Sequence, residues 1–133
     1  MVTLHPPSGP VRARIALPGS KSVANRALVC AALAGETSVV KGLPEATDTR
    51  ILHQLLQERP ARMHCGLGGT TLRFALAWAA VQEGEERLVT GDAALLARPH
   101  HGLVQALCEL GAAIDTTASG FVVKGRRLRG GPL

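Results

Sequence analysis

The sequence predicts an α/β (α+β) fold built from repeated units. Short runs of β-branched residues alternate with longer apolar or amphipathic runs, which is the pattern of strands separated by helices. Two glycine-containing turns, at 17–22 and 66–71, each precede one of the longer runs. Matching residues also recur at an offset of about 47 to 49 positions, within the range of repeat architectures. The matched pairs are Arg26 and Arg73, Gly35 and Gly84, and Gly42 and Gly91.

This repeat predicts two units, about residues 11–66 and 67–131, within a single domain that covers residues 1–133. Stacked units usually need about three copies to bury a continuous core. We therefore expect the domain to be partial.

Composition narrows the function classes. With 46% hydrophobic residues the chain is not disordered by composition, and it has no apolar run long enough to cross a membrane and no signal-peptide pattern. Its three cysteines, Cys30, Cys65 and Cys108, are odd in number and lie far apart without metal-ligand spacing, which predicts buried thiols in a reducing cytoplasm. The net charge of +5 predicts an acidic partner, either nucleic acid or a phosphorylated or carboxylated metabolite. Because only three residues are aromatic, we expect no nucleic-acid partner, and because no apolar run is long enough, we expect no membrane partner.

The segment Leu17–Arg26 predicts the end of a strand, a tight turn and the start of a helix. An alternating run over 11–17 predicts the strand, and apolar residues over 25–34 predict the helix. Ser20 or Ser22 can cap the first turn of that helix.

The start of this helix is a candidate anion site. Free N–H groups at a helix N-terminus attract negative charge. Lys21 and Arg26 lie about a turn apart and could face one bound anion. An ordinary capped helix with a solvated lysine and arginine is the alternative.

The remaining elements follow from the same patterns. Thr47 or Asp48 can cap a second helix, whose apolar face holds Ile51, Leu52 and Leu55. The other predicted elements are strands over 37–41, 63–65 and 86–90, a helix over 72–81, a helix after Gly102, and a closing hairpin of 113–116 and 121–124.

The turn Gly66–Thr71 is a second candidate anion site, with an ordinary tight turn as the alternative. Arg73 follows it in a nearly all-apolar helix, and a buried arginine needs an anionic partner, for which Asp48 is the candidate. Taken alone, Arg98 is more typical of a surface residue. His100 and His101 have no evident third ligand for a metal.

Four segments, in this order, resemble those of one protein family. They are Leu17-Pro18-Gly19-Ser20-Lys21-Ser22 with Asn25-Arg26-Ala27-Leu28, Thr47-Asp48-Thr49, Cys65-Gly66-Leu67-Gly68-Gly69-Thr70-Thr71-Leu72-Arg73-Phe74, and Leu88-Val89-Thr90-Gly91-Asp92 with Arg98-Pro99. Over nearly all of residues 11–131 the chain is similar to EPSP (5-enolpyruvylshikimate-3-phosphate) synthase, the carboxyvinyltransferase of the shikimate pathway.

The resemblance implies a fold of βαβαββ units, six in the family and about two in this chain. It also implies the family's reaction in aromatic amino-acid biosynthesis. The enolpyruvyl group of phosphoenolpyruvate passes to the 5-hydroxyl of shikimate 3-phosphate, phosphate is released, and no cofactor or metal is used.

Roles for individual residues follow from the matched motifs. Lys21 would lie between the two substrates and assist proton transfer. Ser22 and Arg26 would hold the shikimate ring and its carboxylate, and Gly69 (through its backbone) and Arg98 would contact phosphoenolpyruvate. The residues that would support the cleft are Asp48, Thr70 and Arg73.

The chain also departs from the family pattern. Leu67 stands where the family usually has Asn, which removes a donor near the phosphoenolpyruvate site. The family's catalytic Asp and Glu lie in its second half. We therefore expect the N-terminal part of a two-domain synthase, inactive alone and completed by the missing C-terminal part in cis or in trans. The alternative is a non-catalytic anion-binding module or split-enzyme subunit that pairs with another chain.

Overall fold

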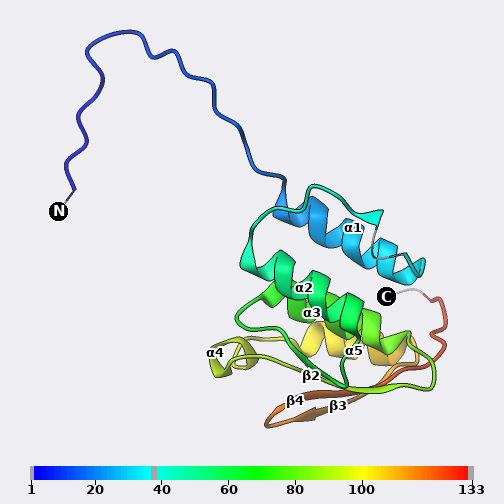
Figure 1. The fold of residues 1–133 in the computed structure, drawn as a ribbon. Coiled ribbons are helices and arrows are strands. Elements are labelled where there is room, and N and C mark those ends of the chain that lie inside the picture. The colour runs from blue at the N-terminus through cyan, green and yellow to red at the C-terminus, as the bar shows by residue number, and fades with distance from the viewer. Residues whose placement is uncertain (1, 37–38, 132–133) are drawn as a thin grey trace.

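The computed structural model describes residues 2–36 and 39–131, which form a four-stranded sheet covered by helices (Figure 1). Within these residues, no helix has the length and apolar character needed to cross a membrane. The elements in chain order are α1 (Lys21–Leu33), α2 (Thr47–Glu58), β1 (Arg62–His64), α3 (Gly69–Ala80), β2 (Glu86–Thr90), α4 (Ala93–Leu96), α5 (His101–Glu109), β3 (Ala113–Thr117) and β4 (Gly120–Lys124).

The sheet has the strand order β1-β2-β4-β3 and is mixed. β1 runs parallel to β2, as expected for two strands joined by a helix, here α3. β4 is antiparallel to both β2 and β3, and the β3–β4 hairpin forms as predicted.

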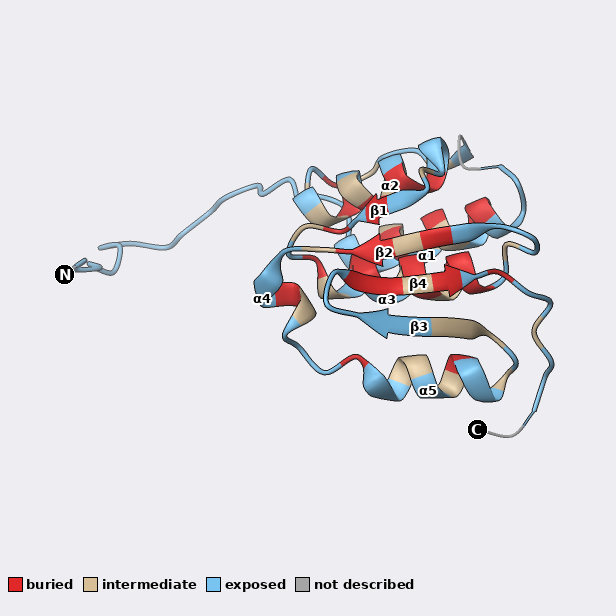
Figure 2. Cartoon of the chain, turned by 90° about the horizontal axis from the view of Figure 1, so that it is seen from below, coloured by how far each residue is buried: buried red, intermediate tan, exposed pale blue. Residues whose placement is uncertain are grey.

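The helices build upward from one face of this sheet. α3 packs on β2 and β4, α5 packs against α3 and β3, and α2 and then α1 lie above α3 (Figure 1). Figure 2 shows the opposite face, with the strands in front, α1 and α3 behind them, and α5 beside the edge strand β3. The centre of the core consists of fully or almost fully buried side chains from α3 and from the strands, namely Met63, Leu72, Leu76, Trp78, Val89 and Val123. The α/β fold class predicted from the sequence is confirmed.

Most element predictions are also confirmed. β2 has the predicted bounds, and α2, α3, α5, β1, β3 and β4 lie within a few residues of theirs. α1 begins at Lys21, four residues before the predicted start, because Ser20 is its N-cap and its Oγ accepts from the N–H of Val23 at 3.4 Å. Gly35 follows the end of α1 with φ of +80°, the left-handed conformation typical of a glycine in that place.

The prediction of a strand over residues 11–17 is wrong, because these residues form no strand. These residues form an extended arm that points away from the body (Figure 1), and the side chains of Ile15 and Leu17 are 77% and 84% exposed. Strand pairing needs the N–H and C=O groups of a neighbouring edge. No described strand lies beside the arm, so the alternating pattern has no partner.

Two smaller predictions fail in the first half of the chain. Within the predicted strand over 37–41, residues 39–41 are not a strand, and residues 37–38 lie outside the described part. Neither Thr47 nor Asp48 caps α2, because Ala46 occupies the N-cap position and both residues lie inside the first turn. Asp48 has another partner, described below.

Candidate functional site

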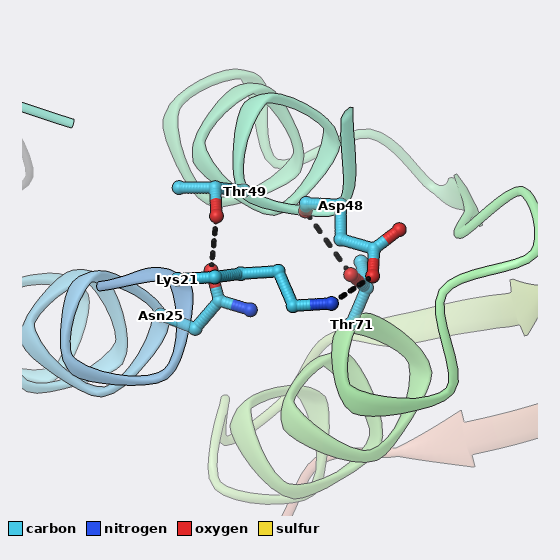
Figure 3. Close-up of polar contacts among 5 residues, drawn as sticks. All are labelled: Lys21, Asn25, Asp48, Thr49 and Thr71. Carbon is cyan, nitrogen blue, oxygen red and sulfur yellow. Dashed lines mark hydrogen bonds and ion pairs between the residues drawn. The ribbon is translucent and has the colours of Figure 1, made fainter. Parts of the chain in front are cut away.

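The first turn of α1 is tied to the first turn of α2 by a charged pair (Figure 3). Nζ of Lys21 lies 2.9 Å from Oδ2 of Asp48, and both side chains are partly exposed. Ser20 starts α1 beside Lys21, so the lysine ammonium and the free N–H groups of the helix lie at one end of the element. This end of α1 therefore combines free N–H groups with an ammonium whose charge Asp48 partly offsets.

Asp48 also reaches the glycine turn that begins α3. A β-carbon placed on Gly68 would lie 3.2 Å from Oδ1 of Asp48 and only 2.7 Å from Oγ1 of Thr71. Thr71 in turn donates from Oγ1 to the backbone oxygen of Asp48 at 3.1 Å (Figure 3). Because a side chain at position 68 would collide with Thr71, this glycine allows the N-termini of α2 and α3 to meet, with Lys21 beside them.

The same turn meets Arg98. A β-carbon on Gly69 would lie 3.4 Å from Nη1 of Arg98, so the guanidinium group stands over the first residue of α3. The fully buried Leu95 places this arginine, since its side chain packs by Gly69 and Gly91 and its backbone oxygen accepts from the N–H of Arg98 at 3.1 Å. The chemistry is that of a phosphate or carboxylate site, because a guanidinium and backbone N–H groups converge.

A buried hydrogen bond beneath Lys21 holds α1 to α2. Oγ1 of Thr49 donates to Oδ1 of Asn25 at 2.8 Å, and both side chains are fully buried. Figure 3 shows Asn25 lying below the Lys21 side chain. The sequence patterns did not predict this contact. The signal was present, because Asn25 shares the buried face of α1 with Leu28 and is the only polar residue there.

The structure does not bring every predicted residue into this site. Arg26 is exposed and folds back along α1, donating from Nη1 to the backbone oxygen of Ser22 at 2.9 Å. Ser22 and Thr70 are both exposed, each within the first turn of its helix.

The expected burial and pairing of Arg73 are wrong. Arg73 is exposed, and Asp48 pairs with Lys21 instead. The physical reason is helical geometry. The buried residues of α3 that are near Arg73 in the sequence lie on other faces of the helix. Position 73 itself faces solvent, because consecutive residues of a helix point in different directions.

A cavity lies beside Arg98. It has a volume of about 420 Å³ and is bordered by Val104 and Phe121 as well as Arg98, away from the Lys21–Asp48 pair. His100 also lines it. This histidine is buried, its Nε2 lies 2.9 Å from the backbone oxygen of Leu95, and its ring meets Phe121 edge-on, which is a packing role.

Cys65, directly before the glycine turn, is chemically silent. Its side chain is fully buried, and burial raises the pKa of its thiol to about 12 from an ordinary value of 9.0. Because the thiolate is the reactive form, this cysteine supplies packing and no nucleophile at neutral pH.

Comparison with known proteins decides the family. A sequence model described as EPSP synthase (3-phosphoshikimate 1-carboxyvinyltransferase) matches residues 6–59 and 53–131, and so covers most of the chain. The chain belongs to the EPSP synthase family. The matched ranges include both helix N-termini described above.

Curated relatives agree with this assignment. The 3-phosphoshikimate 1-carboxyvinyltransferase of Thermus thermophilus is 36% identical to this chain in an alignment that covers 93% of this chain. That of Opitutus terrae is 32% identical in an alignment that covers all of this chain. The chain spans only 35% and 38%, respectively, of these two EPSP synthases. The match to the EPSP synthase of Synechococcus sp. likewise covers 92% of this chain and 35% of the relative.

A solved structure supports the fold. The chain superimposes on the EPSP synthase of Acinetobacter baumannii with a TM-score of 0.67 over 84% of its length, at 21% sequence identity. That alignment covers 31% of the Acinetobacter chain.

Proposed function

We propose that this chain forms part of the site of an EPSP synthase. The reaction transfers the enolpyruvyl group of phosphoenolpyruvate to the 5-hydroxyl of shikimate 3-phosphate and releases phosphate. The observation that carries the proposal is the meeting of two helix N-termini at one place. Lys21 stands at the start of α1, Arg98 stands over the start of α3, and Asp48 lies between the two elements.

The charges of this arrangement suit the substrates. Both substrates are phosphorylated carboxylates, and each needs cationic groups and N–H donors that are already in position. The net charge of +5 adds a general attraction for polyanions. Arg98 and the N–H groups at Gly69 and Thr70 offer a phosphate or carboxylate of phosphoenolpyruvate a bidentate partner and backbone donors.

Lys21 is the proposed catalytic residue. Its ammonium carries three donors, of which Asp48 uses one, so two remain for substrate oxygens. Asp48 holds the ammonium toward the start of α3, where it can pass a proton to or from the reacting enolpyruvyl group. Ser22 and Arg26 are the proposed contacts to the shikimate ring and its carboxylate, with Arg26 leaving the backbone oxygen of Ser22 to reach the ligand.

We further propose that the chain is the N-terminal portion of a two-domain synthase. It would carry two repeats, about residues 11–66 and 67–131, within one partial domain over residues 1–133. The one-third coverage of the curated relatives supports this proposal. The reaction would then need the C-terminal part, in cis or in trans, to close the site from the other side, so we expect the 133-residue chain alone to be inactive.

A chimera tests the function. Residues 1–133 are fused to the part of the Thermus thermophilus synthase that follows its matched region, and phosphate release is measured with both substrates. We expect turnover that requires both substrates, and no turnover by either part alone. Ordinary turnover by the 133-residue chain alone, or by the chimera without shikimate 3-phosphate, would contradict the proposal.

A matched pair of lysine variants assigns the role. Lys21→Met in the chimera should lower kcat by roughly 100-fold or more, the usual effect of losing a general acid–base group. Lys124→Met, at the far end of β4 where the lysine lies near Glu86, should leave kcat unchanged. Equal rates for the two variants would remove Lys21 from the catalytic step.

A non-catalytic anion-binding module remains the second candidate, and Leu67 favours it. This side chain is 57% exposed at the tip of the glycine turn, where the family usually has an asparagine donor. The two candidates differ in selectivity. A simple anion module binds inorganic phosphate and shikimate 3-phosphate equally, whereas the proposed site prefers shikimate 3-phosphate because Ser22 and Arg26 contact its ring and carboxylate.

A further inference from the structure

Three residues form a closed ring of polar contacts at the ends of β1 and β2. The N–H of Gly66 donates to Nδ1 of His64 at 3.3 Å, and the N–H of Asp92 donates to the backbone oxygen of Gly66 at 2.9 Å. The ring closes where Nε2 of His64 lies 3.5 Å from Oδ1 of Asp92. It joins the glycine turn before α3 to the turn before α4, and none of the roles assigned above uses it.

The contacts select one tautomer of the neutral His64 ring. Nδ1 receives a backbone N–H and must therefore carry a lone pair, so the ring proton of the neutral form sits on Nε2 and faces Asp92. In an Asx turn, the side chain of Asn or Asp accepts a hydrogen bond from the backbone N–H two residues later. The ring of His64 accepts the N–H of Gly66 in the same way. His64 therefore shapes the turn at Gly66, whose φ is +57°.

Asp92 is also the N-cap residue of α4, but its carboxylate does not cap the helix. Its backbone oxygen accepts from the N–H groups of Leu95 and Leu96 at 2.8 Å and 3.0 Å, while its side chain turns to His64. α4 thus starts from the ring, and Arg98 follows α4 directly. The other side of the ring leads through the glycine turn to Gly69.

Close packing between the two turns transmits this placement. A β-carbon on Gly91 would lie 2.8 Å from the backbone oxygen of Gly66 and 2.6 Å from Cδ2 of Leu95. Gly91 therefore packs directly against both Gly66 and Leu95, so a shift of one turn presses on the other.

We propose that His64 is a positioning residue that holds Arg98 over Gly69, acting through Gly66 on one side and Asp92 on the other. This inference rests on the proposed function only for the identity of the ligand that the pair receives. The mutual placement of Gly69 and Arg98 is a property of the ligand-free chain, so it can be measured separately.

A series of substitutions in the 133-residue chain separates the two arms of the ring. His64→Asn keeps an acceptor for the N–H of Gly66 but is too short to reach Asp92. His64→Asp keeps the acceptor and places a second negative charge near Asp92. His64→Phe removes both contacts while keeping a side chain of similar size. His53→Phe, at a half-buried histidine on α2, is the matched control, and circular dichroism verifies that each variant is folded.

Two NMR readouts test the proposal. Without ligand, the ¹⁵N shifts of His64 should show protonated Nε2 and bare Nδ1, and His64→Phe should move the signals of the Gly66 and Gly69 amides and the Arg98 guanidinium. With inorganic phosphate as the probe, His64→Phe should weaken binding roughly 3- to 10-fold, the effect of one hydrogen bond. His64→Asn keeps only the contact to Gly66 and should bind phosphate with an affinity between those of the parent and His64→Phe, and His53→Phe should change neither readout.

The proposal is overturned if His64→Phe leaves the Gly69 and Arg98 signals where they are in the parent chain, or if Nδ1 of His64 carries a proton. If the parent chain binds no phosphate, an anion site in the isolated chain is contradicted, the chimera still decides the proposed function, and the ligand-free signals still decide the role of His64. Loss of binding in His64→Asn equal to that in His64→Phe would show that the Asp92 arm alone matters and would contradict the two-sided account.

Discussion

The two halves of this chain carry similar sequence signals and fold differently. Residues 62–124 contain a complete succession of β1, α3, β2, α5, β3 and β4, with the short α4 inserted, whereas the described part of residues 11–59 contains two helices and no strand. A helix satisfies its own N–H and C=O groups, but a strand depends on a neighbour. The helical signals of the first half therefore succeed alone, and its strand signals have no edge to join.

The comparison is visible in the burial of the chain. Figure 2 shows buried residues gathered in β2, β4 and the facing helices, while the arm before α1 is exposed throughout. Because α1 and α2 rest on α3, the second half is the platform on which the candidate site is assembled. The predictions below test this asymmetry.

Thiol reactivity should separate the core from exposed positions most strongly, because Cys65 is buried as predicted, whereas Cys30 and Cys108 are exposed and their predicted burial is wrong. At pH 8 the raised pKa of Cys65 makes its thiolate fraction roughly a thousandfold smaller than that of an ordinary thiol. The side chain of Cys30 on α1, by contrast, is exposed to a reagent. Cys30→Ser and Cys65→Ser variants, labelled with a disulfide reagent, should show that Cys65 reacts only after unfolding. Fast labelling of Cys65 in the folded chain would contradict its place in the core.

The same shift predicts a pH effect on stability. Above about pH 9 the unfolded chain ionises Cys65 while the folded chain keeps it protonated, so the free energy of unfolding falls as pH rises toward 12. Urea unfolding of the parent and Cys65→Ser chains across this range measures the difference.

Truncation of a core side chain and of an arm side chain should differ widely in cost. Met63→Ala in β1 removes a fully buried side chain and should lower the free energy of unfolding by about 2 to 5 kcal/mol. Ile15→Ala in the arm should change it by less than about 0.5 kcal/mol, because the side chain is 77% exposed. A cost for Ile15→Ala similar to that of Met63→Ala, measured by urea unfolding, would mean that the arm pairs with the body.

The matched glycines of the two units should respond unequally. A β-carbon on Gly91 meets the oxygen of Gly66 and the side chain of Leu95, so Gly91→Ala should cost about 1 to 3 kcal/mol. Gly42 has φ of +68° and open space around it, so Gly42→Ala should cost about 1 kcal/mol of backbone strain alone. Thermal unfolding of both variants tests the order, and the reverse order would contradict the close packing of the two turns.

Leu67→Asn should have the smallest effect on stability and a selective effect on binding. The side chain is exposed, so the free energy of unfolding should change by less than about 0.5 kcal/mol. A new donor at the turn should strengthen phosphoenolpyruvate binding by roughly two- to tenfold. Unchanged affinity in a titration would show that position 67 does not face the ligand.

The sequence predicted local structure better than contacts between distant residues. Helices and the closing hairpin follow from periodicity, caps and glycines, as with Ser20 and Gly35. The strand over 11–17 failed because no local pattern reports whether a partner edge exists. Arg73 was expected inside because its neighbours are apolar, although one position of a helix turn can still face solvent.

The site was predicted in its parts and not in its connections. Both helix N-termini and their cations could be identified from residue types and the family resemblance. The pairing of Lys21 with Asp48, 27 residues away, could not, because it depends on how α1 packs against α2. The ring at His64 was missed for the same reason, since its partner Asp92 lies on another strand end.

Binding of shikimate 3-phosphate to the 133-residue chain, followed by NMR, tests the central claim most directly. We predict that the amide signals of Lys21 and Ser22 shift, that phosphoenolpyruvate shifts those of Gly69 and Thr70, and that Arg26→Ala removes the first response. Arg50→Ala, on the exposed side of α2, serves as the control and should leave it intact. Shifts scattered over the basic surface, equal for inorganic phosphate and shikimate 3-phosphate, would contradict a substrate site at these two helix N-termini.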